Sequence, residues 1–242
     1  MIVADLKPLD ELLGFVRGFR RVLVLGCREC VTVCHVGGEK EVAILAQALR
    51  LKAMGEGLQM DFVEKTIQRV CEPEFIDPLL NDLDGAEAIL SLACGVGVNT
   101  CADRGCELPV FPAVNTTFMG STLEHGVWEE RCAGCGECIL HLTGGICPVA
   151  RCPKSIMNGP CGGTQDGMCE ISTPDRPVEC AWALIVERAK KLGTLEQLKR
   201  ILAEKDWSTA RDGGPRRRVR EDLRIAEKHD EEVKEKTAGE AR

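Results

Sequence analysis

The chain has 242 residues, of which 44% are hydrophobic and 29% charged, and this balance is ordinary for a folded globular protein. A formal net charge of −7 excludes a general nucleic-acid binder and a protein that binds anionic membranes through a basic surface, because both need excess Lys and Arg. No apolar run approaches the roughly 20 residues of a membrane span, and the first ten residues lack a basic stretch followed by an apolar one. We therefore expect a cytoplasmic protein without direct membrane insertion.

The first 122 residues alternate short apolar runs with amphipathic stretches. Strands are expected at 21–26, 61–70, 88–93 and 110–114, and helices at 38–54 and 75–83. The first helix carries an apolar stripe formed by Val42, Leu45, Ala46, Leu49 and Ala53. Strand–helix alternation predicts an α/β domain over 1–122 with a Rossmann- or flavodoxin-like, mostly parallel sheet.

Residues 123–204 are rich in cysteine and glycine at first and end in two expected helices, 179–192 and 194–205. We expect a small ferredoxin-like iron–sulfur domain here, with these helices at its C-terminal end. Residues 205–242 contain Arg216, Arg217 and Arg218 and then mixed charge with few large apolar side chains, so they cannot build a core of their own. This last region is either a solvated helix or tail, or an arm that orders on a partner.

Fifteen cysteines are the unusual feature of the composition. The count is odd, no export signal is evident, and a chain of this length does not need disulfides to fold. Clustered thiols in a reducing compartment more often bind metal.

Three cysteines follow the first expected strand at x2 and x3 spacing, namely Cys27, Cys30 and Cys34. The carboxyl ends of strands are where open α/β sheets bind ligands, and three such thiolates can hold one corner of a four-iron cluster. Cys94 is the favoured fourth ligand because small residues follow it, and Cys71 is the alternative. Structural zinc is a second possibility, although zinc sites usually use paired, well-separated C-x2-C motifs.

Eight more cysteines occupy the second region. They begin with a C-x2-C-x2-C motif, and the motif's glycines allow amide–sulfur hydrogen bonds around a cluster. Eight thiols are the number that two [4Fe–4S] clusters need, while zinc fits the later, wider spacings better than it fits the motif. The eight are Cys132, Cys135, Cys138, Cys147, Cys152, Cys161, Cys169 and Cys180. Cys101 and Cys106 lack matching partners and are expected to be small apolar side chains.

Several phrases of the sequence resemble the MetV-type proteins that carry a methylenetetrahydrofolate reductase C-terminal domain. They are GCRECVTVCHVGGEKEVAILAQAL, SLACGVGVNT, CAGCGECILHLTGGICPVARCPKSIMNGPCGGTQDGMCE, ECAW and GGPR. The resemblance reaches about residue 218 and implies the same ligands, with Cys94 completing the first site. It also implies two or three [4Fe–4S] clusters and a flavin on a MetF-like partner, a (β/α)8 barrel that this chain is too short to contain beside a cysteine-rich domain.

Three functions are compatible with these observations. The leading one is an electron-transfer subunit that relays electrons between a further redox subunit and the partner's flavin, without folate-reducing activity of its own. The second is a zinc-stapled scaffold that assembles the reductase without carrying electrons. The third is an independent enzyme with a ligand at the 94–100 loop, which is disfavoured because the four histidines are scattered and unpaired with carboxylates.

Overall fold

The computed structural model describes residues 1–222, and a four-stranded parallel sheet forms the centre of their N-terminal half. The sheet has the order β3-β2-β4-β5 and consists of β2 (Arg21–Cys27), β3 (Asp61–Ile67), β4 (Ala88–Ser91) and β5 (Val110–Pro112). The chain passes from β2 to β3 on one side and then to β4 on the other, as in flavodoxin-like sheets. The predicted α/β class with a parallel sheet is confirmed.

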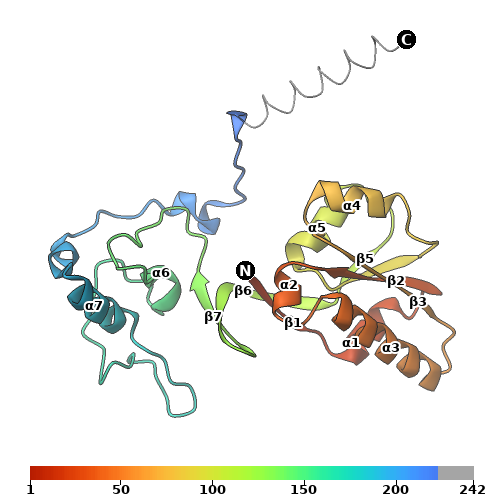
Figure 1. Cartoon of the computed structure of the whole chain (residues 1–242), viewed down its shortest axis with the longest axis horizontal. Helices are drawn as coiled ribbons and strands as arrows, with labels where there is room; N and C mark the ends of the chain where they lie inside the picture. The colour runs from red at the N-terminus through yellow and green to blue at the C-terminus, as the bar shows by residue number, and fades with distance from the viewer. Residues whose placement is uncertain (223–242) are drawn as a thin grey trace, which may run out of the picture.

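Helices cover both faces of this sheet (Figure 1). On one face lie α1 (Leu9–Val16) and α3 (Glu39–Gly55), and on the other lie α4 (Pro73–Leu80) and α5 (Gly95–Asp103). The five apolar residues predicted for the buried stripe of α3 are all buried. A single helical turn, α2 (Cys30–Val33), follows β2 directly.

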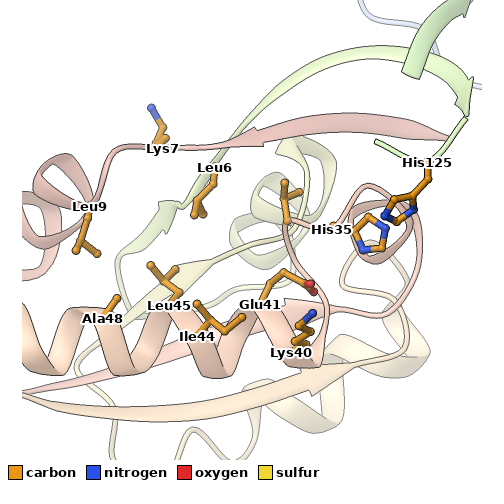
Figure 2. Close-up of a pocket in the computed structure, with 11 residues that line it drawn as sticks. Leu6, Lys7, Leu9, His35, Lys40, Glu41, Ile44, Leu45, Ala48 and His125 are labelled. Carbon is orange, nitrogen blue, oxygen red and sulfur yellow. The ribbon is translucent and has the colours of Figure 1, made fainter. Parts of the chain in front are cut away.

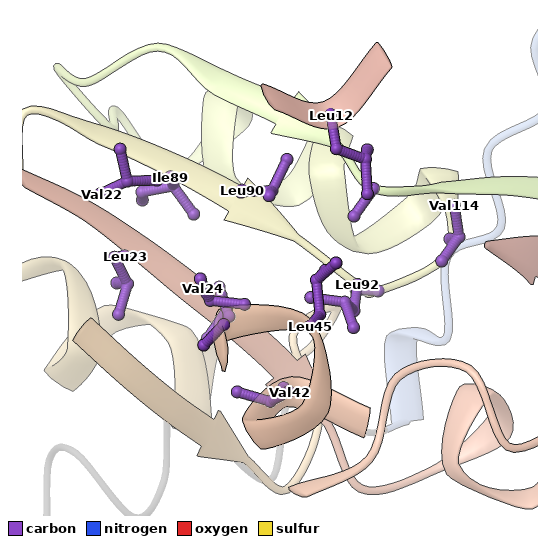
Figure 3. Packing of buried hydrophobic residues seen from close by; sticks show 14 of the residues in the cluster. Leu12, Val22, Leu23, Val24, Val42, Leu45, Ile89, Leu90, Leu92 and Val114 are labelled. Atoms are coloured by element: carbon purple, nitrogen blue, oxygen red, sulfur yellow. The ribbon is translucent and has the colours of Figure 1, made fainter. Parts of the chain in front are cut away.

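The central strands explain why the sequence forms this sheet. Residues 22–25 of β2 and 88–90 of β4 are 0% exposed, because helices cover both faces of a parallel sheet and every position must be apolar. Figure 3 shows Val24 and Leu90 on these strands with Leu12 of α1 and Leu45 of α3 in the same apolar cluster.

A second, antiparallel sheet was not predicted. It has the order β1-β6-β7, with β1 (Ile2–Leu6), β6 (Val114–Glu124) and β7 (Val127–Cys132). Most of β6 is exposed and carries polar residues such as Asn115 and Thr116, so it lacks the apolar run that marks a buried strand. The hairpin of β6 and β7 runs across residue 122 and delivers Cys132 into the C-terminal half.

Several boundaries differ from the predictions. The expected strand 110–114 is divided, because β5 ends at Pro112 and Val114 begins β6 in the other sheet. β3 ends at Ile67 and β4 at Ser91, both earlier than expected, and α4 is shifted towards the N-terminus with Pro73 at its first position. The expected loop over 94–100 is wrong, since α5 begins at Gly95.

Residues 133–220 form α6 (Pro148–Arg151) and α7 (Ala181–Leu192), and otherwise turns, isolated β-bridges, short 3-10 segments and irregular chain. α7 confirms the helix expected over 179–192, and it ends at Gly193 in the left-handed conformation, φ 68°. The helix expected over 194–205 is wrong, because only Leu195–Lys199 form a 3-10 segment, η1. The side-chain amide of Asn158 donates to the carbonyl of Leu202 at 2.9 Å, and its oxygen accepts from the N–H of Leu202 at 2.8 Å. These hydrogen bonds compete with the backbone hydrogen bonds of a helix at this position.

The C-terminal region is only partly described. Residues 205–222 include two 3-10 turns, η2 (Trp207–Thr209) and η3 (Arg211–Gly213), whereas 223–242 of the predicted tail lie outside the described residues. Within the described part, no helix combines the length and apolar character needed to cross a membrane.

Candidate iron–sulfur sites

The carboxyl edge of the parallel sheet gathers three cysteines. Cys27 is the last residue of β2, Cys71 follows β3, and Cys94 follows β4 and precedes the first turn of α5. Burial raises the pKa of the Cys71 thiol, and negative charge on the Cys27 and Cys94 thiolates raises it further, so the three thiols share one neighbourhood. Because β2 and β4 flank the point where the strand order reverses, these thiols occupy the usual ligand position of such a sheet.

The other two cysteines of the first motif point towards the antiparallel sheet. The thiol of Cys34 is buried and lies 3.4 Å from the carbonyl of Cys30 and 3.9 Å from that of Ile2 in β1. Burial raises the pKa of Cys34, and the neighbouring Cys30 thiolate also raises it. Cys27 instead has the carbonyl of Gln68 at 3.9 Å from its sulfur. The structure therefore associates Cys27 with Cys71 and Cys94, and Cys34 with Cys30.

Close packing explains why position 97 is a glycine, which the sequence did not indicate. A Cβ at this position would stand 2.8 Å from the Cβ of Ala93 and 3.1 Å from Val70. The glycine lets α5 lie close to the end of β4 and to the segment after β3. It therefore holds Cys71 and Cys94 on adjoining, tightly packed segments.

Four cysteines of the second region line one cavity of about 230 Å³. The three cysteines of the C-x2-C-x2-C motif lie on a loop that begins at the end of β7. The fourth, Cys147, is the N-cap of α6 and directly precedes Pro148. The backbone N–H of Gly134 donates a hydrogen bond to the sulfur of Cys132 at 3.4 Å, the kind of amide–sulfur contact predicted for this loop. The four are Cys132, Cys135, Cys138 and Cys147.

The remaining four cysteines of this region form a neighbouring group. Cys152, Cys169 and Cys180 pack in a small apolar cluster with Trp182 and Ile185. Trp182 is fixed there by a 2.8 Å hydrogen bond from its indole N–H to the carbonyl of Ile156.

Cys161 is placed with this group by the contacts of the residues around it. The backbone N–H of Gly163 donates to its sulfur at 3.4 Å, repeating the contact at Cys132. The pKa of Lys154 is raised chiefly by its hydrogen bond to Glu170, with a smaller effect from the thiolates of Cys161 and Cys169. The side chain of Lys154 is therefore near both Cys161 and Cys169.

The first and second regions meet at a cavity of about 260 Å³. Cys30 from α2 and Cys132 from the end of β7 both line it, together with Met1, Ile2 of β1 and Met119 of β6. Their approach depends on the pairing of Ile2 with Met119 and of Met119 with Cys132 across the antiparallel sheet. The sequence could not reveal this junction, because the two cysteines are about a hundred residues apart.

Within residues 1–222, no three or more His, Cys, Asp or Glu side chains stand close enough together to hold a single metal ion. A single zinc needs thiolates at about 2.3 Å from one point. A four-iron cluster is a larger body whose ligands surround it. Four cysteines around a cavity of about 230 Å³, with an N–H already directed at one sulfur, fit the larger group.

The start of the C-terminal region packs against the 132–138 loop. The side chain of Lys205 is fully buried and donates to Thr209 Oγ1 at 2.9 Å and to Glu137 Oε2 at 3.5 Å. Thr209 in turn donates to the carbonyl of Cys135 at 3.0 Å. Arg216 donates to the carbonyl of Gly134 at 2.6 Å. We call residues 205–218 the arm, and its contacts fix the backbone of the loop that carries three cysteines.

An apolar cavity of about 640 Å³ lies elsewhere, between α3 and the antiparallel sheet. Figure 2 shows Leu9, Ile44 and Ala48 along it and the imidazoles of His35 and His125 together at one end. The two rings are 5.5 Å apart, centroid to centroid, in an edge-on arrangement. The four histidines are scattered along the sequence, and the β6–β7 turn brings these two together.

Cys101 and Cys106 lie away from these groups. Cys101 is fully buried in the main apolar core, and its burial raises the pKa of the thiol to about 11. Cys106 is half-buried and packs against the same core. Both positions agree with the expected role as small apolar side chains.

Comparison with protein families gives one match. Residues 111–208 match the model of the family described as methylene-tetrahydrofolate reductase C terminal. The matched segment of 98 residues is less than half of the chain. It contains all eight cysteines of the second region and the first residues of the arm, whereas the cysteines of the parallel sheet lie outside it. No curated protein and no solved structure matches the chain.

Proposed function

We propose that the chain is a MetV-type iron–sulfur subunit of a methylenetetrahydrofolate reductase, which relays electrons to or from the flavin of a MetF-like subunit. The observation that carries this proposal is the set of four cysteines around one cavity, with an amide N–H directed at the sulfur of Cys132. The relation of residues 111–208 to the reductase family supports the choice of partner.

The residues divide naturally among three groups. Cys132, Cys135, Cys138 and Cys147 would hold one [4Fe–4S] cluster, and Cys152, Cys161, Cys169 and Cys180 a second, in a ferredoxin-like arrangement. Cys27, Cys30, Cys34 and Cys94 are the ligands expected for a third, with Cys71 as the alternative; its closeness to Cys27 and Cys94 favours a part for Cys71. A bound cluster supplies one-electron exchange, and the protein adjusts its potential through burial and hydrogen bonds to sulfur.

The order of the groups supports a relay. The cavity shared by Cys30 and Cys132 joins the first group to the middle one. The single helix α6 joins the middle group to the last, because it begins directly after Cys147 and ends just before Cys152. The residues Gly134 and Gly163 donate to sulfur in the middle and last groups.

Metal analysis of the anaerobically purified chain tests the proposal. We expect a brown protein that a reductant bleaches, with about 8–12 iron atoms per chain and matching sulfide. EPR of the reduced protein should show interacting paramagnets, because the groups adjoin. A colourless protein containing zinc instead would overturn the relay and leave the zinc-stapled scaffold as the function.

Association with the flavin subunit is tested separately. The chain and the MetF-like subunit, produced together, should co-purify, and reduced clusters should be oxidised when methylenetetrahydrofolate is added to the complex. The chain alone should not reduce the folate. Failure of the two subunits to associate would overturn the assignment to this reductase.

A further inference from the structure

The arm lines a further cavity, of about 780 Å³, whose lining is dominated by arginine. Arg211, Arg216, Arg217 and Arg218 line it together with Gly136 and Thr209. All four arginines are exposed. Among the described residues Arg211, Arg217 and Arg218 make no ion pair, whereas Arg216 is occupied by the carbonyls of Gly134 and Thr209.

This concentration of positive charge stands out against the rest of the chain. Residues 205–220 contain six basic and two acidic residues, although the whole protein has a net charge of −7. The only acidic residues on this stretch are Asp206, whose carboxylate accepts from the N–H of Ser208, and Asp212. The patch therefore attracts anionic groups while the remainder of the surface repels them.

The position of the patch connects it with the cysteines. Gly136 lines both the arginine cavity and the cavity of Cys132, Cys135, Cys138 and Cys147. A Cβ at Gly136 would lie 2.3 Å from the carbonyl of Thr209, so arm and loop are in direct contact there. Anything bound among the arginines is separated from the proposed middle cluster only by this loop.

We propose that the arginine cavity docks a carboxylate-rich segment of the protein that exchanges electrons with this chain. The inference rests on the proposed function for its partner, while the binding chemistry stands on the arm itself. Guanidinium groups bind carboxylates in bidentate fashion. Trp207 precedes Ser208, which lines the cavity, and its 41% exposed indole offers the aromatic contact that protein interfaces favour.

A protein occupant fits better than a nucleic acid or a single small anion. The acidic remainder of the chain repels a phosphate backbone. The cavity, about 780 Å³, is far larger than one phosphate. Its arginines that make no ion pair among the described residues come from η3 (Arg211) and from the irregular segment that follows it (Arg217 and Arg218).

Binding of an octaglutamate peptide to the full-length protein tests the proposal, with octaglutamine as the uncharged control. We expect octaglutamate to bind at about 50 mM salt and to bind more weakly at about 200 mM, because the contact is ionic. The double variant Arg217→Glu/Arg218→Glu should weaken binding at least tenfold. It spares Arg216, which holds the arm in place.

The matched control is Arg20→Glu/Lys191→Glu, which changes the net charge equally at two exposed positions outside the arm. This control should bind octaglutamate within about twofold of the natural protein. Equal loss in both double variants would mean that only overall charge matters, and absence of binding to the natural protein would also overturn the proposal. Displacement of the peptide by equimolar inorganic pyrophosphate would identify a small-anion site instead.

The result of the peptide-binding experiment does not depend on whether the proposed clusters are present. Peptide binding is measured as a dissociation constant, whereas the proposed function is tested by iron content and EPR. A protein that binds the peptide but holds no iron would retain the docking site for acidic segments and lose the relay. A protein with full iron content and no peptide binding would retain the relay and lose the docking site.

Discussion

Arg216 reaches back across the chain to Gly134, and its Nη1 donates to that backbone carbonyl at 2.6 Å. The same nitrogen donates to the carbonyl of Thr209 at 2.9 Å. One guanidinium thus ties the arm to the loop between Cys132 and Cys135. Residues 82 positions apart in sequence form this link, which makes the arm part of the candidate site.

Replacing Arg216 by alanine should release the arm. Hydrogen bonds from a charged donor contribute about 1.5–3 kcal/mol, and we expect the lower end because Arg216 is exposed. Hydrogen exchange of residues 205–218 should accelerate roughly tenfold. Arg217→Ala is the control, since Arg217 has no ion pair in the described structure, and equal exchange in the two variants would contradict the link.

Gly136→Ala should damage the contact between arm and loop. Gly136 has φ +84°, where an L-residue costs roughly 1–2 kcal/mol, and its Cβ would in addition meet Thr209 at 2.3 Å. Gly126→Ala is matched, because Gly126 has the same φ but nothing within 4 Å of the new Cβ. In urea unfolding, the substitution at 136 should cost more than the one at 126; equal costs would mean that the close approach is unimportant.

Cys135→Ser should remove about four iron atoms per chain, because one thiolate of a four-cysteine set is lost. Cys161→Ser should remove a similar number from the other group. Iron should remain at the unaffected groups in each variant. Cys106→Ser, at a half-buried cysteine outside both groups, should keep full iron content. Unchanged iron in the Cys135 variant would mean that the motif does not bind the metal.

Leu90→Ala should lower the free energy of unfolding, because it removes a buried side chain from the parallel sheet. Leu90 is 0% exposed at the centre of β4, so truncation leaves a cavity and should cost about 2–5 kcal/mol of unfolding free energy. Ile44→Ala, at a side chain 58% exposed, should change it by less than about 0.5 kcal/mol. Similar chemical-denaturation midpoints for both variants would argue against the described core.

The raised pKa of Cys101 should make the free energy of unfolding fall at alkaline pH. Its pKa is raised to about 11 in the folded protein, chiefly by burial, from an ordinary value of 9.0. Between these pH values the folded state holds a proton that the unfolded state has released, so stability falls as pH rises from 9 to 11.

The variant Cys101→Ala removes this contribution and should flatten the decline of the unfolding midpoint over that range. The chain has no tyrosine, so lysines and the other cysteines supply the remaining background. Identical slopes for the variant and the natural protein would show that Cys101 does not titrate differently on unfolding.

The sequence by itself determined the parallel sheet and the division of most of the cysteines between two separate regions. Strands buried on both faces must be apolar throughout, which made 21–26 and 88–93 recognisable, and a single buried stripe marked α3. Local spacing marked the motif of Cys132, Cys135 and Cys138, because these three cysteines lie on one short loop.

Only the tertiary structure decided which distant residues meet. The exposed strand β6 has no apolar run, so the antiparallel sheet and the approach of Cys30 to Cys132 could not be predicted. The association of Cys71 with Cys27 and Cys94 depends on strand order, and the arm depends on the Arg216–Gly134 contact. Local pattern fixes what each segment buries, whereas contacts between exposed polar segments follow from the path of the folded chain.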